Sequence, residues 1–426
     1  MHHLASNPLP HRALRDLAQK HGPAIMHLQL GQVQTIVVSS AQIAEAILKI
    51  CTIELFSAKM IKSFGSIRED EVSKLVAAVS AASSSAAGVD LTAMFCKLTY
   101  SILSRAAFGE VRESSSSSEA FLPLIDEITR VASGFNIADL YPSFKFLQVL
   151  TGVASKLNVL HEKADKVLES IIADHRARIG HMRRPGEEAE EETAADLLDV
   201  LLKHHEGEGN MGFSLTTDNI KAVLVVKTTA TSLDWIMSEL VKNPRVMQKT
   251  QSEVRRVFGP QGKVDEARLH ELTYLKMVIR ESMRLHPPVA VLLPRTGAED
   301  CEIGGYHIPA GSSIMVNAWA IGRNPEYWTD AETFWPERFL ESSVDYKGAH
   351  FQLLPFGAGR RICPGMSFAL ANLELPLARL LYYFDWKLPD GQENECVDMT
   401  ETFGATVKRK NKLFLIPTVA SSPDGN

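Results

Sequence analysis

The stretch Phe356–Gly365, which reads Phe-Gly-Ala-Gly-Arg-Arg-Ile-Cys-Pro-Gly, constrains this chain more than any other. Glycines on both sides of the cysteine let the backbone come close to a flat ligand. Pro364 fixes φ and removes one N–H directly after Cys363, and the remaining N–H groups can point at the sulfur. Arg361 can reach an anionic group at the rim of the ligand. The stretch, called the haem loop below, therefore predicts that Cys363 is a thiolate ligand of haem iron.

A buried structural cysteine beside a tight turn is the alternative for the same loop. The pattern Phe-x-x-Gly-x-Arg-x-Cys-x-Gly specifies five positions in ten, so a chance match is improbable. We therefore predict a haem b site in which Cys363 is the metal ligand. Its predicted cofactor-binding residues in the loop are Phe356, Gly359, Arg361, Cys363 and Gly365.

The haem loop resembles that of the cytochrome P-450 family, the haem-thiolate monooxygenases. Residues 272–288 resemble the K helix of the family, where Glu281 and Arg284 are three apart and can pair on one helical face. In the family a second arginine, here Arg338 in the segment 334–339, completes a locked triad behind the haem. A solvated surface pair is the alternative for Glu-x-x-Arg alone. The order and spacing of the three motifs favour a buried triad, which keeps its charges only while all partners are present.

The resemblance implies further site residues. Arg295, in the segment that follows the K helix, is similar to the second propionate-binding arginine of the family, and a solvated arginine is the alternative. The same segment and the turn near residue 404 supply substrate-facing candidates, whose small or apolar side chains suit a hydrophobic molecule. These candidates are Val289, Ala290, Val291, Leu292, Phe403, Gly404 and Ala405.

The resemblance also implies a fold and an activity. We expect one cytochrome P-450 domain over residues 1–426, mainly α, with the haem loop near 356–365 and a small β-rich lobe from about 24–38 and 301–317. The expected reaction inserts one oxygen atom from O₂ into a small hydrophobic substrate, with electrons from NADPH-cytochrome P-450 reductase. The later segments are most similar to plant microsomal enzymes of specialised metabolism. That similarity favours a terpenoid substrate and a location on the cytosolic face of the endoplasmic reticulum membrane.

Composition is consistent with a large folded protein. Apolar residues make up 45% of the 426 residues and charged residues 23%, which allows a sizeable core. The net charge of −6 argues against nucleic acid as a partner. The five cysteines are scattered and no Cys-x-x-Cys occurs, so we expect no disulfide framework. No run of 18 apolar residues is present, and the chain resembles its relatives only from just after their N-terminal anchor and hinge.

Periodicity and turn signals predict the order of elements. Loops and linkers are expected at 84–88, 114–118 and 183–192. The predicted helices cover 10–21, 40–49, 54–83, 91–108, 120–133, 152–179, 216–258 and the K helix, and the predicted strands form hairpins at 25–38 and 302–311 and continue over 312–319.

The chain departs from the family after Lys49. In relatives several tens of residues follow, including a loop over the substrate and a Trp-x-x-x-Arg helix that binds a haem propionate. In this chain, the segment that begins at Ile50 already resembles the part of the family that follows that helix. Trp319 and Arg323 repeat the spacing but lie beyond the K helix, so we exclude them as propionate ligands. We therefore expect part of the roof over the distal face to be missing.

A second departure affects the helix on the oxygen side of the haem. Counting back from Trp235, Thr228 takes the position of the catalytic alcohol, while Lys227 stands where the family has an acid and Val225 where it has glycine. About six residues are absent, which shortens a helix by roughly 9 Å and turns its halves by about 240° against each other. An ordinary polar helix residue is the alternative for Thr228.

These departures leave two expectations for function. The family activity is a monooxygenase, and the acid and alcohol of that family deliver protons to bound oxygen. The alternative is a catalytically impaired or non-catalytic haem-binding remnant from a shortened gene model or splice form. We expect weak or uncoupled oxygen activation in the chain as written.

Overall fold

The computed structural model describes most of the C-terminal half of the chain and parts of the N-terminal half. The described residues are 25–30, 33–38, 58–83, 88–108, 124, 127, 152–182, 228–259, 262–293, 295–296, 299–303, 306–310, 312–314, 316–359, 362–402, 404 and 406–420.

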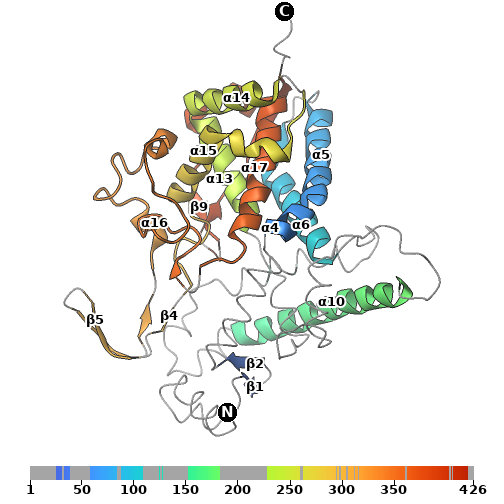
Figure 1. Ribbon diagram of the computed structural model, residues 1–426, viewed down its shortest axis with the longest axis vertical. Coiled ribbons are helices and arrows are strands. Elements are labelled where there is room, and N and C mark those ends of the chain that lie inside the picture. Colours follow the sequence, from blue (N-terminus) through green and yellow to red (C-terminus); the bar gives the residue numbers. More distant parts are fainter. Residues whose placement is uncertain are drawn as a thin grey trace, which may run out of the picture.

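A body of packed helices forms the upper part of the molecule in Figure 1. Helix α13 lies inside it, since every residue from Thr229 to Val241 is buried and the helix packs against α6, α14, α15 and α17. Of these neighbours, α14 buries one face, as an amphipathic helix does, whereas α17 is buried along most of its second half. The helices of the body are α4 (Ala58–Ser63), α5 (Gly65–Ala82), α6 (Leu91–Phe108), α13 (Thr228–Lys242), α14 (Pro244–Phe258), α15 (Thr273–Leu285) and α17 (Met366–Tyr383).

Short antiparallel sheets accompany the helices. Strands β3 (Val89–Asp90), β11 (Phe414–Val419) and β8 (Phe384–Lys387) form one three-stranded sheet against the body. The other sheets have two strands each, and among the described residues they do not join one another. They pair β1 (Ile25–Leu30) with β2 (Val33–Val38), β4 (Arg295–Thr296) with β7 (Ser313–Ile314), β5 (Cys301–Ile303) with β6 (Tyr306–Ile308), and β9 (Glu401–Thr402) with β10 (Lys408–Arg409).

The predicted mainly helical fold and both predicted hairpins are confirmed. Ile25 pairs with Val38 in the first hairpin, and Cys301 pairs with Ile308 in the second. The apolar helix predicted over 91–108 coincides with α6, and the helix predicted over 152–179 is α10 (Val153–Met182), which lies below the body in Figure 1.

Three element predictions need correction. The helix predicted over 216–258 is divided at Asn243, because Pro244 disfavours helical geometry in the residue before it, and Asn243 has φ −118° and ψ 79°. The helix predicted over 54–83 is divided at Phe64 into α4 and α5. The strand predicted over 312–319 ends at Ile314, and α16 (Ala318–Ile321) begins where the Asn317 side chain accepts a hydrogen bond from the Ala320 N–H at 2.9 Å.

Several predicted elements lie outside the described residues. They are the helices at 10–21 and 40–49, the loops at 114–118 and 183–192, residues 84–87 of the small-residue linker, and 216–227 of the long helix. Of the helix predicted over 120–133 only Leu124 and Glu127 are described, and both are helical.

Candidate functional site

The haem loop folds back on itself before α17. The Cys363 N–H donates to the Phe356 carbonyl at 2.9 Å, and the Ile362 N–H donates to the Gly359 carbonyl at 3.1 Å. Gly357 and Gly359 have φ of 72° and 67°, a left-handed geometry that glycine adopts without penalty. The glycines of the motif therefore let the loop turn back and present Cys363 three residues before α17 begins.

Cys363 is an exposed residue and is not bonded to another cysteine. Packing around the sulfur removes it partly from water and so raises the pKa of this thiol, and a hydrogen bond from the Gly365 N–H opposes that shift. The nearby N-terminus of α17 also favours negative charge on the sulfur. Exposure does not fit the buried structural cysteine considered as an alternative. A free thiol that already receives one N–H, in a loop bent by glycines, fits the thiolate donor that haem iron takes.

Phe356, the first residue of the haem loop, packs against an aromatic side chain of the preceding segment. Its ring meets the ring of Tyr346 edge-on, with centroids 5.5 Å apart. Close packing also restricts Gly348, because a Cβ there would lie 2.9 Å from the Ile362 side chain. The backbone of the haem loop is therefore seated on the segment that precedes it.

The side chains of the two arginines predicted to contact haem lie outside the described part of the structure. Arg361 lies outside the described residues. Arg295 is described only through its backbone, in β4, where it pairs with Ile314. Both roles stay predictions.

The structure brings Glu281, Arg284 and Arg338 together as one buried cluster, called the closed cluster below. Arg284 donates two hydrogen bonds to Glu281 through Nε and Nη2, each 2.8 Å from a carboxylate oxygen. Arg338 Nε reaches the same carboxylate at 2.9 Å, as does the N–H of Trp335 at 2.8 Å. The side chains of Glu281 and Arg284 are 0% exposed and that of Arg338 is 6% exposed. These values do not fit a solvated surface pair.

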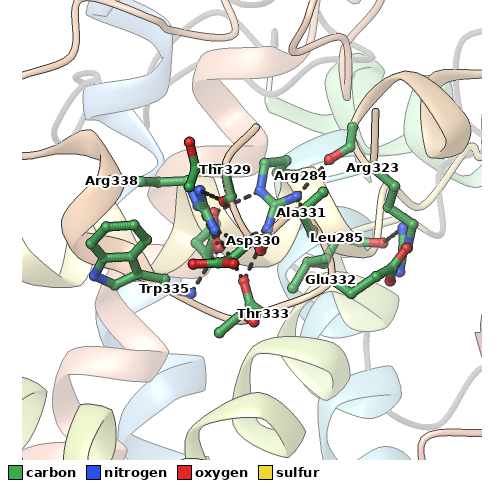
Figure 2. A network of polar contacts seen from close by, with 12 residues as sticks. Arg284, Leu285, Arg323, Thr329, Asp330, Ala331, Glu332, Thr333, Trp335 and Arg338 are labelled. Atoms are coloured by element: carbon green, nitrogen blue, oxygen red, sulfur yellow. Dashed lines mark hydrogen bonds and ion pairs between the residues drawn. The ribbon is translucent and has the colours of Figure 1, made fainter. Parts of the chain in front are cut away.

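The remaining guanidinium N–H groups of the closed cluster bind backbone carbonyls. Figure 2 shows Arg284 and Arg338 reaching into the same stretch of chain, between Thr329 and Thr333. Arg284 Nη1 donates to the Ala331 carbonyl at 2.6 Å, and Arg338 Nη1 donates to the Thr329 carbonyl at 2.8 Å. Every side-chain nitrogen of both arginines therefore has an acceptor, so the cluster orders this stretch at little electrostatic cost.

The closed cluster is connected to the haem loop by apolar packing. Trp328, Phe339 and Leu353 form one buried group. The Arg284 guanidinium lies 5.2 Å from the centre of the Trp328 ring. Leu353 stands three residues before Phe356. The cluster can therefore fix where the haem loop starts.

Trp319 and Arg323, excluded as propionate ligands, have other partners. The Arg323 guanidinium lies 3.9 Å from the centre of the Trp319 ring and donates to Glu332 and to the Leu285 carbonyl. Burial lowers the pKa of Arg323. These contacts connect α16 to the end of α15.

Thr228 is the first residue of α13, and its carbonyl accepts a hydrogen bond from Ser232 Oγ at 3.3 Å. Lys227 lies outside the described residues. Three residues along, the Thr231 hydroxyl lies 3.4 Å from the Thr406 hydroxyl. The catalytic role of Thr228 stays a prediction.

The two predicted substrate segments lie side by side. The Val407 N–H donates to the Pro288 carbonyl at 2.8 Å, which joins the chain just before Val289 to the turn that holds Gly404. The segment 289–292 is also held on the α16 side, where the Leu292 N–H donates to the Val316 carbonyl at 2.9 Å. Phe403 and Ala405 lie outside the described residues.

Sequence analysis missed one residue of this region. His286 directly follows α15 and is buried against α13. Its signal in the sequence was a titratable side chain directly after the K helix and before two prolines, Pro287 and Pro288.

The helical body with an exposed, N–H-assisted cysteine in a glycine loop defines a haem-thiolate protein. Comparison with known proteins agrees. The family model described as "Cytochrome P450" matches residues 49–416. Desmethyl-deoxy-podophyllotoxin synthase from Sinopodophyllum hexandrum is 46% identical, over 98% of this chain and 89% of its own length. Premnaspirodiene oxygenase from Hyoscyamus muticus is 43% identical, over 96% of this chain and 88% of its own length.

A solved zebrafish cytochrome P450, in a structure with progesterone, shares the fold with a TM-score of 0.65 at 22% identity, covering 97% of this chain and 100% of that one. The chain belongs to the cytochrome P450 family. Its relatives are plant oxygenases and hydroxylases of specialised metabolites.

Membership of the family specifies the chemistry in general terms. The chain is a monooxygenase by family and takes haem b. When bound, the haem supplies an iron centre that activates O₂. Enzymes of the family need a redox partner and O₂ and act on small substrates, and the plant relatives are typically membrane-bound. Within the described part of the chain, no helix has the length and apolar character needed to cross a bilayer.

Proposed function

We propose that this chain inserts one oxygen atom from O₂ into a small hydrophobic plant metabolite, with a terpenoid as the first candidate. Its electrons come from NADPH-cytochrome P-450 reductase, and it works on the cytosolic face of the endoplasmic reticulum membrane. The observation that carries the proposal is the exposed, unpaired Cys363 thiol with the Gly365 N–H directed at it.

The protein contributes positioning and charge to this reaction. The Gly365 N–H and the start of α17 stabilise negative charge on the Cys363 sulfur, which is the form that binds iron. Arg295 and Arg361 are proposed to pair with the haem propionates. The closed cluster supports the loop from behind through Trp328 and Leu353.

The substrate class is supported by the candidate residues and by the relatives. Ala290 and Leu292 are buried, Val289 and Val291 are partly exposed, and all four are apolar. An apolar lining favours a hydrocarbon-like ligand. Relatives named premnaspirodiene oxygenase and salviol synthase are 43% and 41% identical to this chain. They support oxidation of a plant terpenoid here.

The test uses the purified full chain with the reductase, NADPH and a panel of terpene hydrocarbons that begins with premnaspirodiene. The proposal expects a product that carries one oxygen atom from isotopically labelled O₂. The Cys363→Ala variant is the matched control and should give none. A product whose new oxygen atom comes from water would contradict the proposal.

A second function, haem binding without productive turnover, is favoured by two observations. The first is Lys227 where the family has an acid. The second is that the alignment with desmethyl-deoxy-podophyllotoxin synthase runs over 464 positions, 38 more than the 426 residues of this chain, so the relative has residues inside the matched region that this chain lacks. For this function, NADPH consumption should yield peroxide rather than product. Restoring both absent segments together should then recover product.

A further inference from the structure

His286 lies between aromatic and acidic side chains of α13. Its side chain is 7% exposed. The imidazole stacks on the Trp235 indole, with centroids 4.0 Å apart and planes 5° from parallel. Its Nε2 atom is 2.7 Å from a Glu239 carboxylate oxygen. Stacking and the hydrogen bond together fix the ring against α13.

The other ring nitrogen of His286 is directed toward a second carboxylate. Nδ1 is 3.9 Å from a Glu401 oxygen, too far for a hydrogen bond, and among the described residues this buried atom has no hydrogen-bond partner. Glu401 also accepts a hydrogen bond from Trp319 Nε1 at 3.2 Å. His286, Glu239 and Glu401, called the open cluster below, therefore place one imidazole between two acids, with one contact made and one just out of reach.

The same residues connect backbone segments that the proposed function assigns to the substrate. Trp235 Nε1 donates to the Val407 carbonyl at 3.0 Å, and the Val407 N–H donates to the Pro288 carbonyl at 2.8 Å. Pro288 is two residues after His286. Glu401 in β9 stands at one end of the turn 402–407, and Val407 stands at the other. One end of the turn therefore follows Glu401, which faces His286, and the other end is held by Trp235, which stacks on His286.

We propose that His286 is a positioning residue that holds the turn 402–407 and the segment 288–292 against α13, and so determines which carbon of the substrate is oxygenated. This rests on the proposed function, since that function assigns both segments to the substrate. His286 acts through Glu401 and Trp235. It touches neither haem nor the reacting atoms in this account.

The approach of His286 to Glu401 is the part of the open cluster that a substitution can alter without disturbing the rest. Glu401 is exposed on β9, so replacing its charge leaves the buried His286–Glu239 contact in place. Glu401→Gln is therefore the main variant, and His286→Phe, which keeps a ring to stack on Trp235, is the second. Glu395→Gln makes the same chemical change on an exposed carboxylate that takes no part in these contacts, and serves as the control.

The experiment measures two quantities on the full, haem-loaded chain. Hydrogen exchange followed by mass spectrometry should show several-fold faster exchange at residues 401–409 in Glu401→Gln and His286→Phe, and no change in Glu395→Gln. The ratio of oxygenated products from the same terpene panel should shift in the first two variants, while the amount of bound haem stays constant.

Two results would overturn the inference, and a third would separate it from the proposed function. The first is hydrogen exchange at residues 401–409 that is no faster in Glu401→Gln than in the control Glu395→Gln. This result overturns the inference even if His286→Phe fails to fold. Faster exchange with an unchanged product ratio would make His286 a structural residue only. Unmodified chain that takes up no haem would end the proposed function; exchange, which needs neither haem nor turnover, would then decide alone whether His286 holds the turn.

Discussion

The closed and open clusters lie at the same end of α15 and differ in how completely they are bonded. In the closed cluster one carboxylate receives two arginines, and every side-chain nitrogen of Arg284 and Arg338 has an acceptor. In the open cluster one imidazole faces two carboxylates, and no described residue forms a hydrogen bond with His286 Nδ1. A fully bonded buried network is rigid, whereas a partly bonded one has an alternative arrangement within reach.

The difference matches what each cluster supports. The closed cluster orders residues 329–333 and, through Trp328 and Leu353, the approach to the haem loop. The open cluster holds a turn and a segment that are proposed to meet the substrate. The thiolate needs one fixed position, whereas a substrate surface benefits from elements that can adjust.

The largest effect is expected from Arg284→Ala, which breaks the closed cluster. Removing one partner leaves Glu281 buried with its charge only partly compensated, which costs about 3–5 kcal/mol in the free energy of unfolding. The product should be haem-free and aggregating. Urea unfolding and haem content measure this, with Arg245→Ala, an exposed partner of Glu337, as control. Normal haem content in Arg284→Ala would contradict the assigned role.

Arg338→Lys is expected to have an intermediate effect on the same cluster. Lysine keeps the charge near Glu281 but loses the planar fork that also binds the Thr329 and Thr333 carbonyls. One or two lost hydrogen bonds should lower the free energy of unfolding by about 1–3 kcal/mol. A loss as large as that of Arg284→Ala would show that the fork, and not the charge, holds the cluster.

Acid should weaken the open cluster. The nearby His286 ring, followed by the hydrogen bond from the Trp319 N–H, keeps the pKa of Glu401 below its ordinary value of 4.5. Because the folded-state pKa is depressed, this carboxylate stabilises the fold above pH 4.5, and the contribution is lost as the pH falls through the folded pKa. Unfolding measured against pH should show a shallower acid limb in Glu401→Gln. An unchanged acid limb would remove Glu401 from the cluster.

The smallest effect is expected from Trp319→Phe. The phenyl ring can still lie under Arg323, and only the N–H donated to the exposed Glu401 is lost. The free energy of unfolding should fall by about 0.5–1.5 kcal/mol. A larger loss in urea unfolding would indicate that α16, rather than His286, holds β9.

The closed cluster was predicted and the open one was missed for a physical reason. Glu281 and Arg284 are one helical turn apart, so spacing allows them to pair, and the resemblance to the family added Arg338 and burial. His286 finds its partners through the tertiary path of the chain, since Glu239 is 47 residues away in α13 and Glu401 lies in β9. The break at Asn243 was readable from Pro244, yet helical periodicity continues across it and hides it.

The haem loop was predictable because its glycines, proline and cysteine act over a few residues. The positive φ angles of Gly357 and Gly359 follow from residue type, and they allow the backbone hydrogen bond from Cys363 to Phe356. The roles of Thr228, Arg295, Arg361, Phe403 and Ala405 depend on where a bound haem and substrate lie, so they remain predictions.

The central claim is that Cys363 holds haem iron as a thiolate. It is tested most directly by the absorbance spectrum of the reduced, carbon monoxide-bound full chain beside its Cys363→Ala variant. The account predicts a thiolate-type Soret band in the unmodified chain and none in the variant, since no other group of the haem loop is a soft anionic ligand. Absence of haem from the unmodified chain, or a thiolate-type band that persists in the variant, would contradict it.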